Sequence, residues 1–173
     1  MKRLCSLLFL WVLCVSCDYS FDLNDPDVRE FVFRLKNGTY ECFLTSSSGE
    51  RLGLQMPAFQ MKDIPELLSY AEDTTRIKAF PDNPVYAISS SHLDDESYIL
   101  GECLLWVVEG IRVNKLYPSR QPLLIKTVGT IKYFLTTDEV LEVWSLYNQW
   151  WEDHQNGDWP DIDPLEGSIY SWY

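Results

Sequence analysis

Two glutamates and an arginine within one strongly apolar run are the first residues whose types suggest chemistry. Glu102, Glu109 and Arg112 all belong to the run LGECLLWVVEGIR. Paired carboxylates carry out acid–base chemistry on glycosides, but seven residues of helix separate two Cα atoms by about 10 Å, which is too loose to predict a stereochemical outcome. We therefore expect a buried structural network, in which Glu109 and Arg112 pair with each other or with loop residues such as Asp82 and Asn83. A ligand site and a catalytic site are the alternatives.

The other candidates for catalysis are few. Nucleophilic catalysis requires a Ser or Cys beside a base, and the chain offers two imidazoles, His92 and His154. His92 stands in SSSHLDDE, a pattern typical of the polar start of a helix. Four acidic residues near the C-terminus lack the ligand spacing of a calcium loop, so we expect solvated turns there, and no metal or cofactor in the protein. These residues are Asp158, Asp161, Asp163 and Glu166.

The seven tryptophans supply a further possibility. Tryptophans at helical spacing usually belong to a core, whereas an exposed indole ring can stack on a sugar. Trp144 and Trp151 fall on the expected inward face of one amphipathic helix, and Trp150 lies to one side of it. Trp150 and Trp159 are therefore the candidates for stacking on a glycan.

The first seventeen residues have the features of an export signal. Two basic residues precede an apolar run of about a dozen residues, which ends at Ser16 and Cys17. A membrane-spanning helix needs about 20 apolar residues, whereas a basic start, a short apolar middle and a small residue before the cut are typical of a signal peptide. In bacterial lipoprotein signals the cut precedes a cysteine whose thiol receives a diacylglycerol. We expect removal of residues 1–16, lipidation of Cys17 and a short tether over 17–24; an ordinary signal peptide cut after Ser16 is the alternative.

The remaining chain is strongly acidic. Without Lys2 and Arg3 the 14 Lys and Arg residues fall to 12, against 26 Asp and Glu, which gives a net charge of −14. Nucleic-acid binding requires clusters of Lys and Arg, and we find no basic stripe, so we expect no nucleic acid as a partner. The charge favours solubility, and it would attract a basic partner over a distance.

Two cysteines remain outside the signal and the lipidation site. Cys42 and Cys103 could pair in an oxidising compartment. Cys103, however, stands among leucines and valines, where cysteine behaves as a small buried hydrophobic residue. We expect two free buried thiols.

Four stretches show the apolar periodicity of helices. In the first, Asp25 is expected to cap the helix, Pro26 to be its first residue and Gly38 to end it in a left-handed turn. In the last, Thr136 and Glu139 form a capping pattern. The third is apolar over more than half its circumference, so it is expected at the centre of the fold. The four stretches are 25–38, 60–73, 94–112 and 136–154.

The rest of the chain predicts a small amount of β-structure. β-forming residues on both sides of a Gly-Thr turn predict a hairpin over 123–135. A short strand is expected at 39–45, followed by a loop at 46–53. The aromatic-rich end, 163–173, has no period and is expected to pack across the domain. We therefore predict an α+β fold, mainly α, with about four main helices and one small β-hairpin in a single globular domain over 25–173.

Six phrases occur together in the chain: PAFQMKDIPELLSYAED, FPDNP, LGECLLWVVEGIR, YPSRQP, YNQWW and DPLEGSIYSWY. Their combination resembles a family of small bacterial lipoproteins known as a domain of unknown function. The resemblance covers most of residues 25–173, and it implies a degenerate HEAT-like pair formed by the second and third helices. Ile169 departs from the family pattern, which has a glycine there. Because the family has no established activity, the resemblance implies fold and location only.

These observations predict a lipid-anchored protein of the cell envelope, facing the periplasm or exposed at the cell surface. Its domain is expected to be a non-enzymatic binding or structural domain, with a protein or a glycan as the ligand. An acidic inhibitor or immunity-type protein that binds a basic partner is one alternative. A glycan-acting hydrolase that uses Glu102 or His92 is the other.

Overall fold

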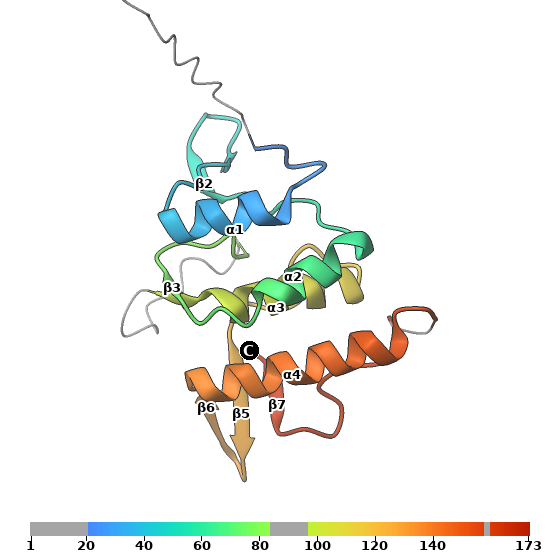
Figure 1. Ribbon diagram of the computed structural model, residues 1–173. Coiled ribbons are helices and arrows are strands. Elements are labelled where there is room, and N and C mark those ends of the chain that lie inside the picture. The colour runs from blue at the N-terminus through green and yellow to red at the C-terminus, as the bar shows by residue number, and fades with distance from the viewer. Residues whose placement is uncertain (1–20, 84–96, 158–159) are drawn as a thin grey trace, which may run out of the picture.

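The computed structural model describes residues 21–83, 97–157 and 160–173 (Figure 1). These residues form an α+β fold that is mainly α, as the sequence predicted. The helices are α1 (Val28–Asn37), α2 (Ile64–Tyr70), α3 (Leu100–Arg112) and α4 (Thr137–His154), with a 3-10 turn, η1 (Met61–Asp63), before α2. The strands are β1 (Phe43–Thr45), β2 (Arg51–Leu54), β3 (Arg76–Ile77), β4 (Tyr98–Ile99), β5 (Leu124–Val128), β6 (Ile131–Phe134) and β7 (Tyr170–Trp172).

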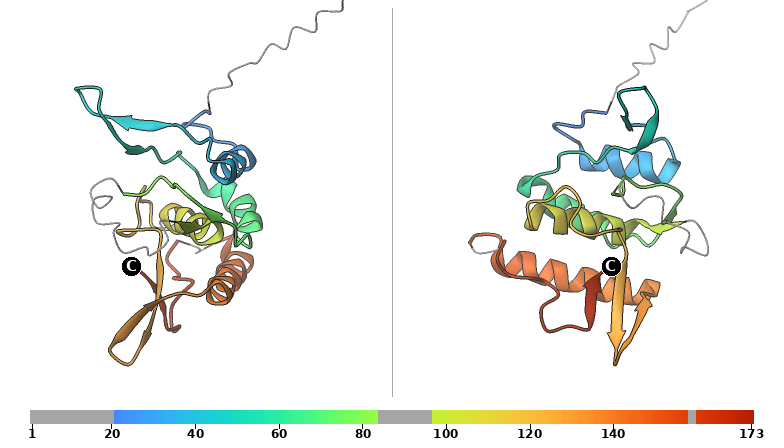
Figure 2. Two further views of the ribbon diagram at one scale, coloured as in Figure 1. Left: turned by 90° about the vertical axis from the view of Figure 1, so that its left-hand side faces the viewer. Right: turned by 180° about the vertical axis from the view of Figure 1, so that it is seen from behind.

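Three of the helices stack in a column and the fourth lies inside. The left-hand view of Figure 2 shows α1, α2 and α4 one above another along one side, with α3 beside α2 on the inner side. α2 contacts α1, α3 and α4, and α3 contacts α4. The adjacency of α2 and α3 agrees with the expected central pair, and the likeness of this pair to a HEAT repeat stays a prediction. No helix among the described residues is both long enough and apolar enough to span a membrane.

α1 begins later than the sequence predicted. Asp27 rather than Asp25 caps the helix, because its side chain accepts a backbone hydrogen bond of 2.7 Å from the first turn. Pro26 therefore precedes the helix, and Asp25 forms an exposed ion pair of 2.6 Å with Lys62. Gly38 ends α1 at a φ of 66°, as predicted.

α3 also begins later, at Leu100 rather than at residue 94. Tyr98 and Ile99 are extended and pair with β3, in keeping with the strand preference of aromatic and β-branched side chains. The first N–H groups of α3, which have no partner inside the helix, are satisfied by the neighbouring backbone. Leu100 donates to the carbonyl of Thr75 and Gly101 to that of Asp73.

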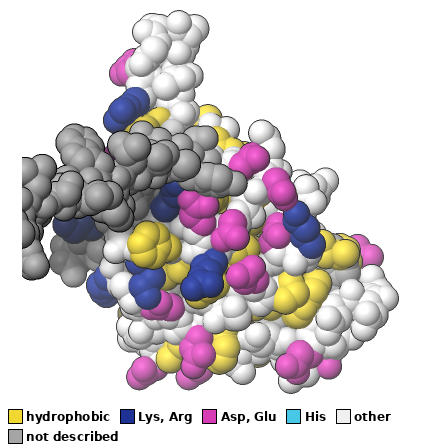
Figure 3. Space-filling model, turned by 45° about the horizontal axis from the view of Figure 1, so that its top comes forward, with side chains coloured by type: hydrophobic (Ala, Val, Ile, Leu, Met, Phe, Trp, Pro, Cys, Tyr) yellow, Lys and Arg dark blue, Asp and Glu magenta, His cyan; other side chains and the backbone are white. Residues whose placement is uncertain are grey.

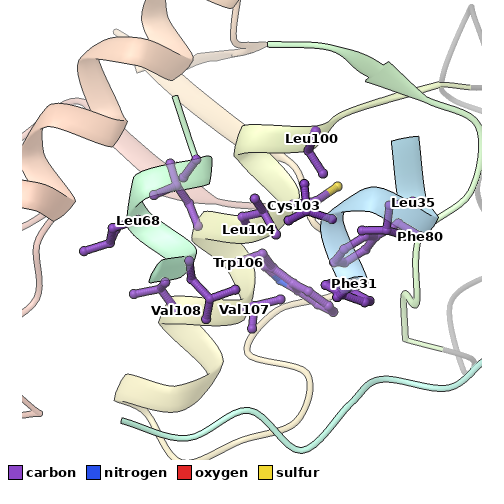
Figure 4. Packing of buried hydrophobic residues seen from close by; sticks show 14 of the residues in the cluster. Phe31, Leu35, Leu68, Phe80, Leu100, Cys103, Leu104, Trp106, Val107 and Val108 are labelled. Carbon is purple, nitrogen blue, oxygen red and sulfur yellow. The ribbon is translucent and has the colours of Figure 1, made fainter. Parts of the chain in front are cut away.

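α3 forms the centre of the core, as its sequence predicted. Every residue from Leu100 to Gly110 is buried. Figure 4 shows Trp106 of α3 directed toward Phe31 of α1 and Phe80, and the rings of Phe80 and Trp106 lie 6.1 Å apart. α2 supplies Leu68 to the same cluster.

The β-structure is richer than the sequence predicted. β5 and β6 form the expected hairpin, with Gly129 in the turn at a φ of 63°. The C-terminal segment adds β7 to the other side of β5, giving the strand order β6-β5-β7. The prediction that 163–173 packs on the domain is thus confirmed. The expected loop at 46–53 was wrong in part, because its second half is β2, which pairs with β1.

The two cysteines of the described residues are both free thiols. Cys103 is buried, and burial raises the pKa of its thiol. Cys42 is half-buried rather than buried. The prediction of two free buried thiols is therefore confirmed for Cys103, whereas the predicted burial was wrong for Cys42.

Candidate functional site

An apolar groove lies between the C-terminal half of α3 and the segment that leads into η1. Its volume is about 440 Å³, within the range of 300–1,000 Å³ typical of ligand pockets. One wall is the stretch 56–61, and the other combines α3 with the turn that follows it. The lining residues are Met56, Pro57, Ala58, Phe59, Gln60, Met61, Val107, Gly110, Ile111, Asn114, Lys115 and Leu116.

The first wall is fixed by hydrogen bonds to distant parts of the chain. Ala58 donates its backbone N–H to the carbonyl of Leu23 at 2.8 Å, and the hydroxyl of Tyr40 donates to the carbonyl of Gln55 at 2.6 Å. Phe59 packs its ring edge-on against Phe31 of the core, with 5.2 Å between centroids. An extended segment without helix or strand is thereby held as a defined surface.

The second wall depends on a tight turn after α3. The N–H of Lys115 bonds to the carbonyl of Gly110 at 2.9 Å, and Asn114 adopts the left-handed conformation at a φ of 51°. A Cβ atom on Gly110 would lie 2.7 Å from the carbonyl oxygen of Lys115. Glycine is therefore required here for the chain to fold back against the helix.

The groove can bind an apolar group, and its lining offers little for catalysis. Met61 and Leu116 are 48% and 52% exposed, on opposite walls. Among the lining residues of the described chain, Lys115 is the one ionisable side chain. Gln60 and Asn114 add neutral hydrogen-bonding groups. This composition suits a ligand with an apolar body and a polar or anionic end.

The predicted pairing of Glu109 and Arg112 is present. The guanidinium contacts both carboxylate oxygens, at 2.7 and 2.9 Å, and this hydrogen bonding raises the pKa of Arg112 above its ordinary value. The hydroxyl of Tyr147 donates to Glu109 at 2.9 Å, and Trp172 donates its indole N–H to the same hydroxyl at 2.9 Å. The network therefore joins α3 to α4 and to β7.

Arg112 reaches the C-terminal segment, and Asp82 bonds elsewhere. Arg112 donates to the carbonyl of Pro160 at 3.1 Å, so it holds the C-terminal segment. Asp82 instead accepts a hydrogen bond of 3.1 Å from the hydroxyl of Tyr98, and burial raises the pKa of its carboxyl. Of the two predicted alternatives, the pairing of Glu109 with Arg112 is therefore the one that the structure contains, while Asp82 is bonded to Tyr98 of β4, just before α3.

Glu102 stands apart from this network. Its carboxylate accepts a hydrogen bond from the backbone N–H of Leu124, the first residue of β5. The side chain is almost fully buried, and burial raises the pKa of Glu102 to about 8, although the Leu124 bond and the charge of Arg76 oppose this shift. Glu102 thus attaches α3 to the sheet and lies outside the lining of the groove.

The predicted inward face of α4 was wrong at its tryptophans. Trp150 is 4% exposed and packs at 6.0 Å against Tyr147, whereas Trp144 and Trp151 are half-buried. A ring so deeply buried has no free face for a sugar, so Trp150 cannot serve as a stacking platform in this conformation. Trp159 lies outside the described residues.

Several other candidates also fall outside them. Cys17, His92 and Asp158 are not among the described residues. Within the described ranges, no group of three or more His, Cys, Asp or Glu side chains is placed to hold a metal ion. Asp163 lies 4.0 Å from Arg112, at the edge of the ion-pair network.

Residues 22–173 match the family described as Domain of unknown function (DUF4943). The chain belongs to this family. The match begins just before Leu23, so it includes both walls of the groove and the whole Glu109–Arg112 network. No curated protein and no solved structure matches the chain.

Sequence reasoning missed the groove in this DUF4943 domain. The two walls are about 50 residues apart in the sequence, and no sequence pattern within the stretch 56–61 predicts which helix this stretch faces. The available signal was indirect. Met61 and Leu116 are large apolar residues outside the four α-helices, and Gly110 leaves room on the C-terminal half of α3.

Proposed function

We propose that this protein is an exported lipoprotein, held at a membrane through lipidated Cys17, whose domain binds an apolar segment of another envelope protein. The groove carries this proposal, because its lining is apolar and has one cation at its edge. The domain is proposed to be non-enzymatic. We further propose that α2 and α3 are a degenerate HEAT-like pair, supported by their adjacency.

The position of the groove along the chain supports a ligand near the membrane. Ala58 in the groove wall is hydrogen-bonded to Leu23. Leu23 is the sixth residue after Cys17, and six residues of extended chain reach about 20 Å. A lipid on Cys17 would thus keep the groove within that distance of the bilayer surface, facing the periplasm or the cell exterior.

The alternatives have less support. A glycan-acting hydrolase would need an accessible acid, and Glu102 is buried against Leu124. An acidic inhibitor would present a concentrated negative surface, whereas Figure 3 shows acidic side chains scattered among hydrophobic ones on the face in view. A protein ligand is favoured over a glycan because the groove wall offers methionine and leucine rather than exposed tryptophan.

The groove can be tested with matched leucine substitutions. Leu116→Glu places a charge on the groove wall, and Leu52→Glu places one on β2, where Leu52 is 51% exposed and lies outside the groove. Each full-length variant is expressed in cells, cross-linked and purified from membranes, and the captured proteins are compared by mass spectrometry. We expect Leu116→Glu to lose specific partners that Leu52→Glu retains. If both variants capture the same set as wild type, the groove is not the binding site.

Anchoring is tested separately. Wild type is expected to sediment with membranes and to begin at a lipidated Cys17, because two or more acyl chains give stable attachment. Cys17→Ser should be soluble or remain unprocessed. A wild-type protein that is soluble, unlipidated and cut elsewhere would make this an ordinary secreted protein.

A further inference from the structure

One continuous part of this acidic chain has cations and no acids. Between residues 110 and 137 there are five Lys and Arg residues and neither Asp nor Glu. These are Arg112, Lys115, Arg120, Lys126 and Lys132. The cations are several residues apart, which is why no basic stripe stands out in the sequence. The segment contains the β5–β6 hairpin, which projects from the helices in Figure 2.

The hairpin exposes large apolar side chains as well. Val128, Ile131, Tyr133 and Phe134 are between 45% and 55% exposed. Phe134 forms an edge-to-face pair with Tyr173 at 5.8 Å, and Tyr173 is itself 37% exposed. Exposed aromatic pairs beside cations are typical of the residues that contribute most to protein interfaces.

The edge of the sheet is also open at β6. In the order β6-β5-β7, β5 is the central strand and β6 has one strand neighbour. Val128 pairs with Ile131 across the two-residue turn, which makes these two a hydrogen-bonded pair. Hydrogen-bonded and non-hydrogen-bonded pairs alternate along an antiparallel ladder. The backbone N–H and C=O groups of Lys132 and Phe134 therefore point away from β5, toward the open edge. Thr127, which lies opposite Lys132 on β5, agrees with this assignment. Its N–H points away from β6 and donates to the carbonyl of Ile169, on the β7 side, at 3.0 Å.

Lys132 has a positive charge and also lies on the open edge of β6. It is exposed, and no acidic side chain in the described ranges forms an ion pair with it. Lys126, the other lysine of the hairpin, points to the opposite face of the sheet and is paired with Glu139 of α4. Lys132 thus lies on the open edge with its charge available, next to the Phe134–Tyr173 pair.

We propose that β6 is the docking edge for an acidic, extended polypeptide segment, which adds as a further strand beside Lys132 and Phe134. Edge strands bind extended peptides by main-chain hydrogen bonds, with side-chain pockets for specificity. Acidic side chains of the segment lie beside Lys132, and apolar ones cover Phe134 and Tyr173. This surface is separate from the groove and does not depend on its function.

Two other occupants fit less well. A second copy would bring an identical Lys132-containing edge against this one, and lysine on an edge strand discourages such pairing. An anionic membrane would satisfy the charge of Lys132 but not the outward backbone groups, since open sheet edges are not tolerated in hydrocarbon. In Figure 1 the hairpin also lies at the opposite end of the domain from α1, which follows the first described residues.

The test uses the full-length chain in nonionic detergent and fluorescein-labelled peptides. The probe peptide alternates Val and Glu over about eight residues, enough for one strand. A second peptide has Lys in place of Glu. Two further peptides carry backbone N-methyl groups, one on its odd-numbered residues and the other on its even-numbered residues. Binding is followed by fluorescence anisotropy at several salt concentrations. Lys132→Glu is compared with Lys78→Glu, which makes the same charge change at an exposed lysine outside both the three-stranded sheet and the groove lining, and the thermal melt of each variant confirms that it folds.

We expect saturable, salt-sensitive binding of the Val-Glu peptide and much weaker binding of the Val-Lys peptide. N-methylation in one phase should abolish binding, because it removes the donors that face β6. Lys132→Glu should weaken binding about tenfold, since an attraction becomes a repulsion, while Lys78→Glu changes it little. Equal binding of both peptides, insensitivity to N-methylation, or no saturable binding overturns the proposal. Competition by phosphatidylglycerol in the micelles would assign the edge to lipid, and a dimer lost in Lys132→Glu would assign it to a second copy.

Discussion

Replacing Arg112 with alanine tests the network that joins α3, α4 and the C-terminal strand. The Arg112 and Glu109 side chains are 10% and 9% exposed, so each has exchanged most of its hydration for the other. Removing the arginine leaves Glu109 buried, and among the described residues the hydroxyl of Tyr147 is then its one hydrogen-bonding partner. It also removes the hydrogen bond that holds the carbonyl of Pro160.

The expected loss of stability is large for a single substitution. Removing one partner of a buried ion pair costs about 3–5 kcal/mol, and we take about 3 kcal/mol because the guanidinium lies near the surface. In a domain of this size each kcal/mol lowers the Tm by about 2–4 °C. Arg112→Ala should therefore lower the Tm by about 6–12 °C.

The assay is thermal unfolding followed by circular dichroism. The control is Lys36→Ala, which removes an ion pair of 2.6 Å with Asp73 whose side chains are more exposed. Surface pairs contribute about 0–1 kcal/mol, so this variant should melt within a few degrees of wild type. If Arg112→Ala melts like Lys36→Ala, the network contributes no more than a surface pair. Arg112 would then become a candidate ligand residue.

Three further outcomes follow from the structure. Burial raises the pKa of Glu102 from 4.5 to about 8 in the folded state. The protonated side chain therefore contributes its full stability below pH 4.5, and this contribution is lost as the pH rises to about 8. Glu102→Gln should flatten the decline of Tm between these two pH values. Gly101→Ala should destabilise strongly, because its Cβ would overlap the carbonyl oxygen of Ala71, the residue after α2, whereas Gly157→Ala meets nothing within 4 Å and should melt like wild type. Deleting 164–173 removes β7 and should lower the Tm clearly; a truncated protein with unchanged Tm would show that the tail does not support the fold.

The helix ends that were predicted correctly depend on contacts between residues close together in the sequence. Thr136 and Glu139 form the capping box of α4, and Gly38 ends α1, because such contacts lie within one turn. The start of α1 was wrong because Asp25 and Asp27 flank Pro26 and both can cap. In the structure Asp27 caps the helix, whereas Asp25 forms an exposed ion pair with Lys62, 37 residues further along the chain.

The errors in the site arise from long-range geometry. Trp150 was placed beside the inward face of α4, but the buried positions are Val140, Val143, Tyr147 and Trp150, which follow the period of 3.6 residues as one stripe. The half-buried Trp144 and Trp151 border it. Glu102 found its partner in the backbone of Leu124, which no side-chain pattern identifies. The groove requires knowing that 56–61 faces the end of α3.

α3 links both proposed surfaces to one frame. Val107 and Gly110 line the groove, Glu102 bonds to the start of β5, and Glu109 bonds through Tyr147 toward Trp172 of β7. The sheet that carries the β6 edge is thus attached to the groove-bearing helix at two points about two helical turns apart. Breaking one of them should therefore leave the sheet attached by the other. Arg112→Ala is accordingly expected to lower stability while leaving the β6 edge able to bind an acidic strand below its melting temperature.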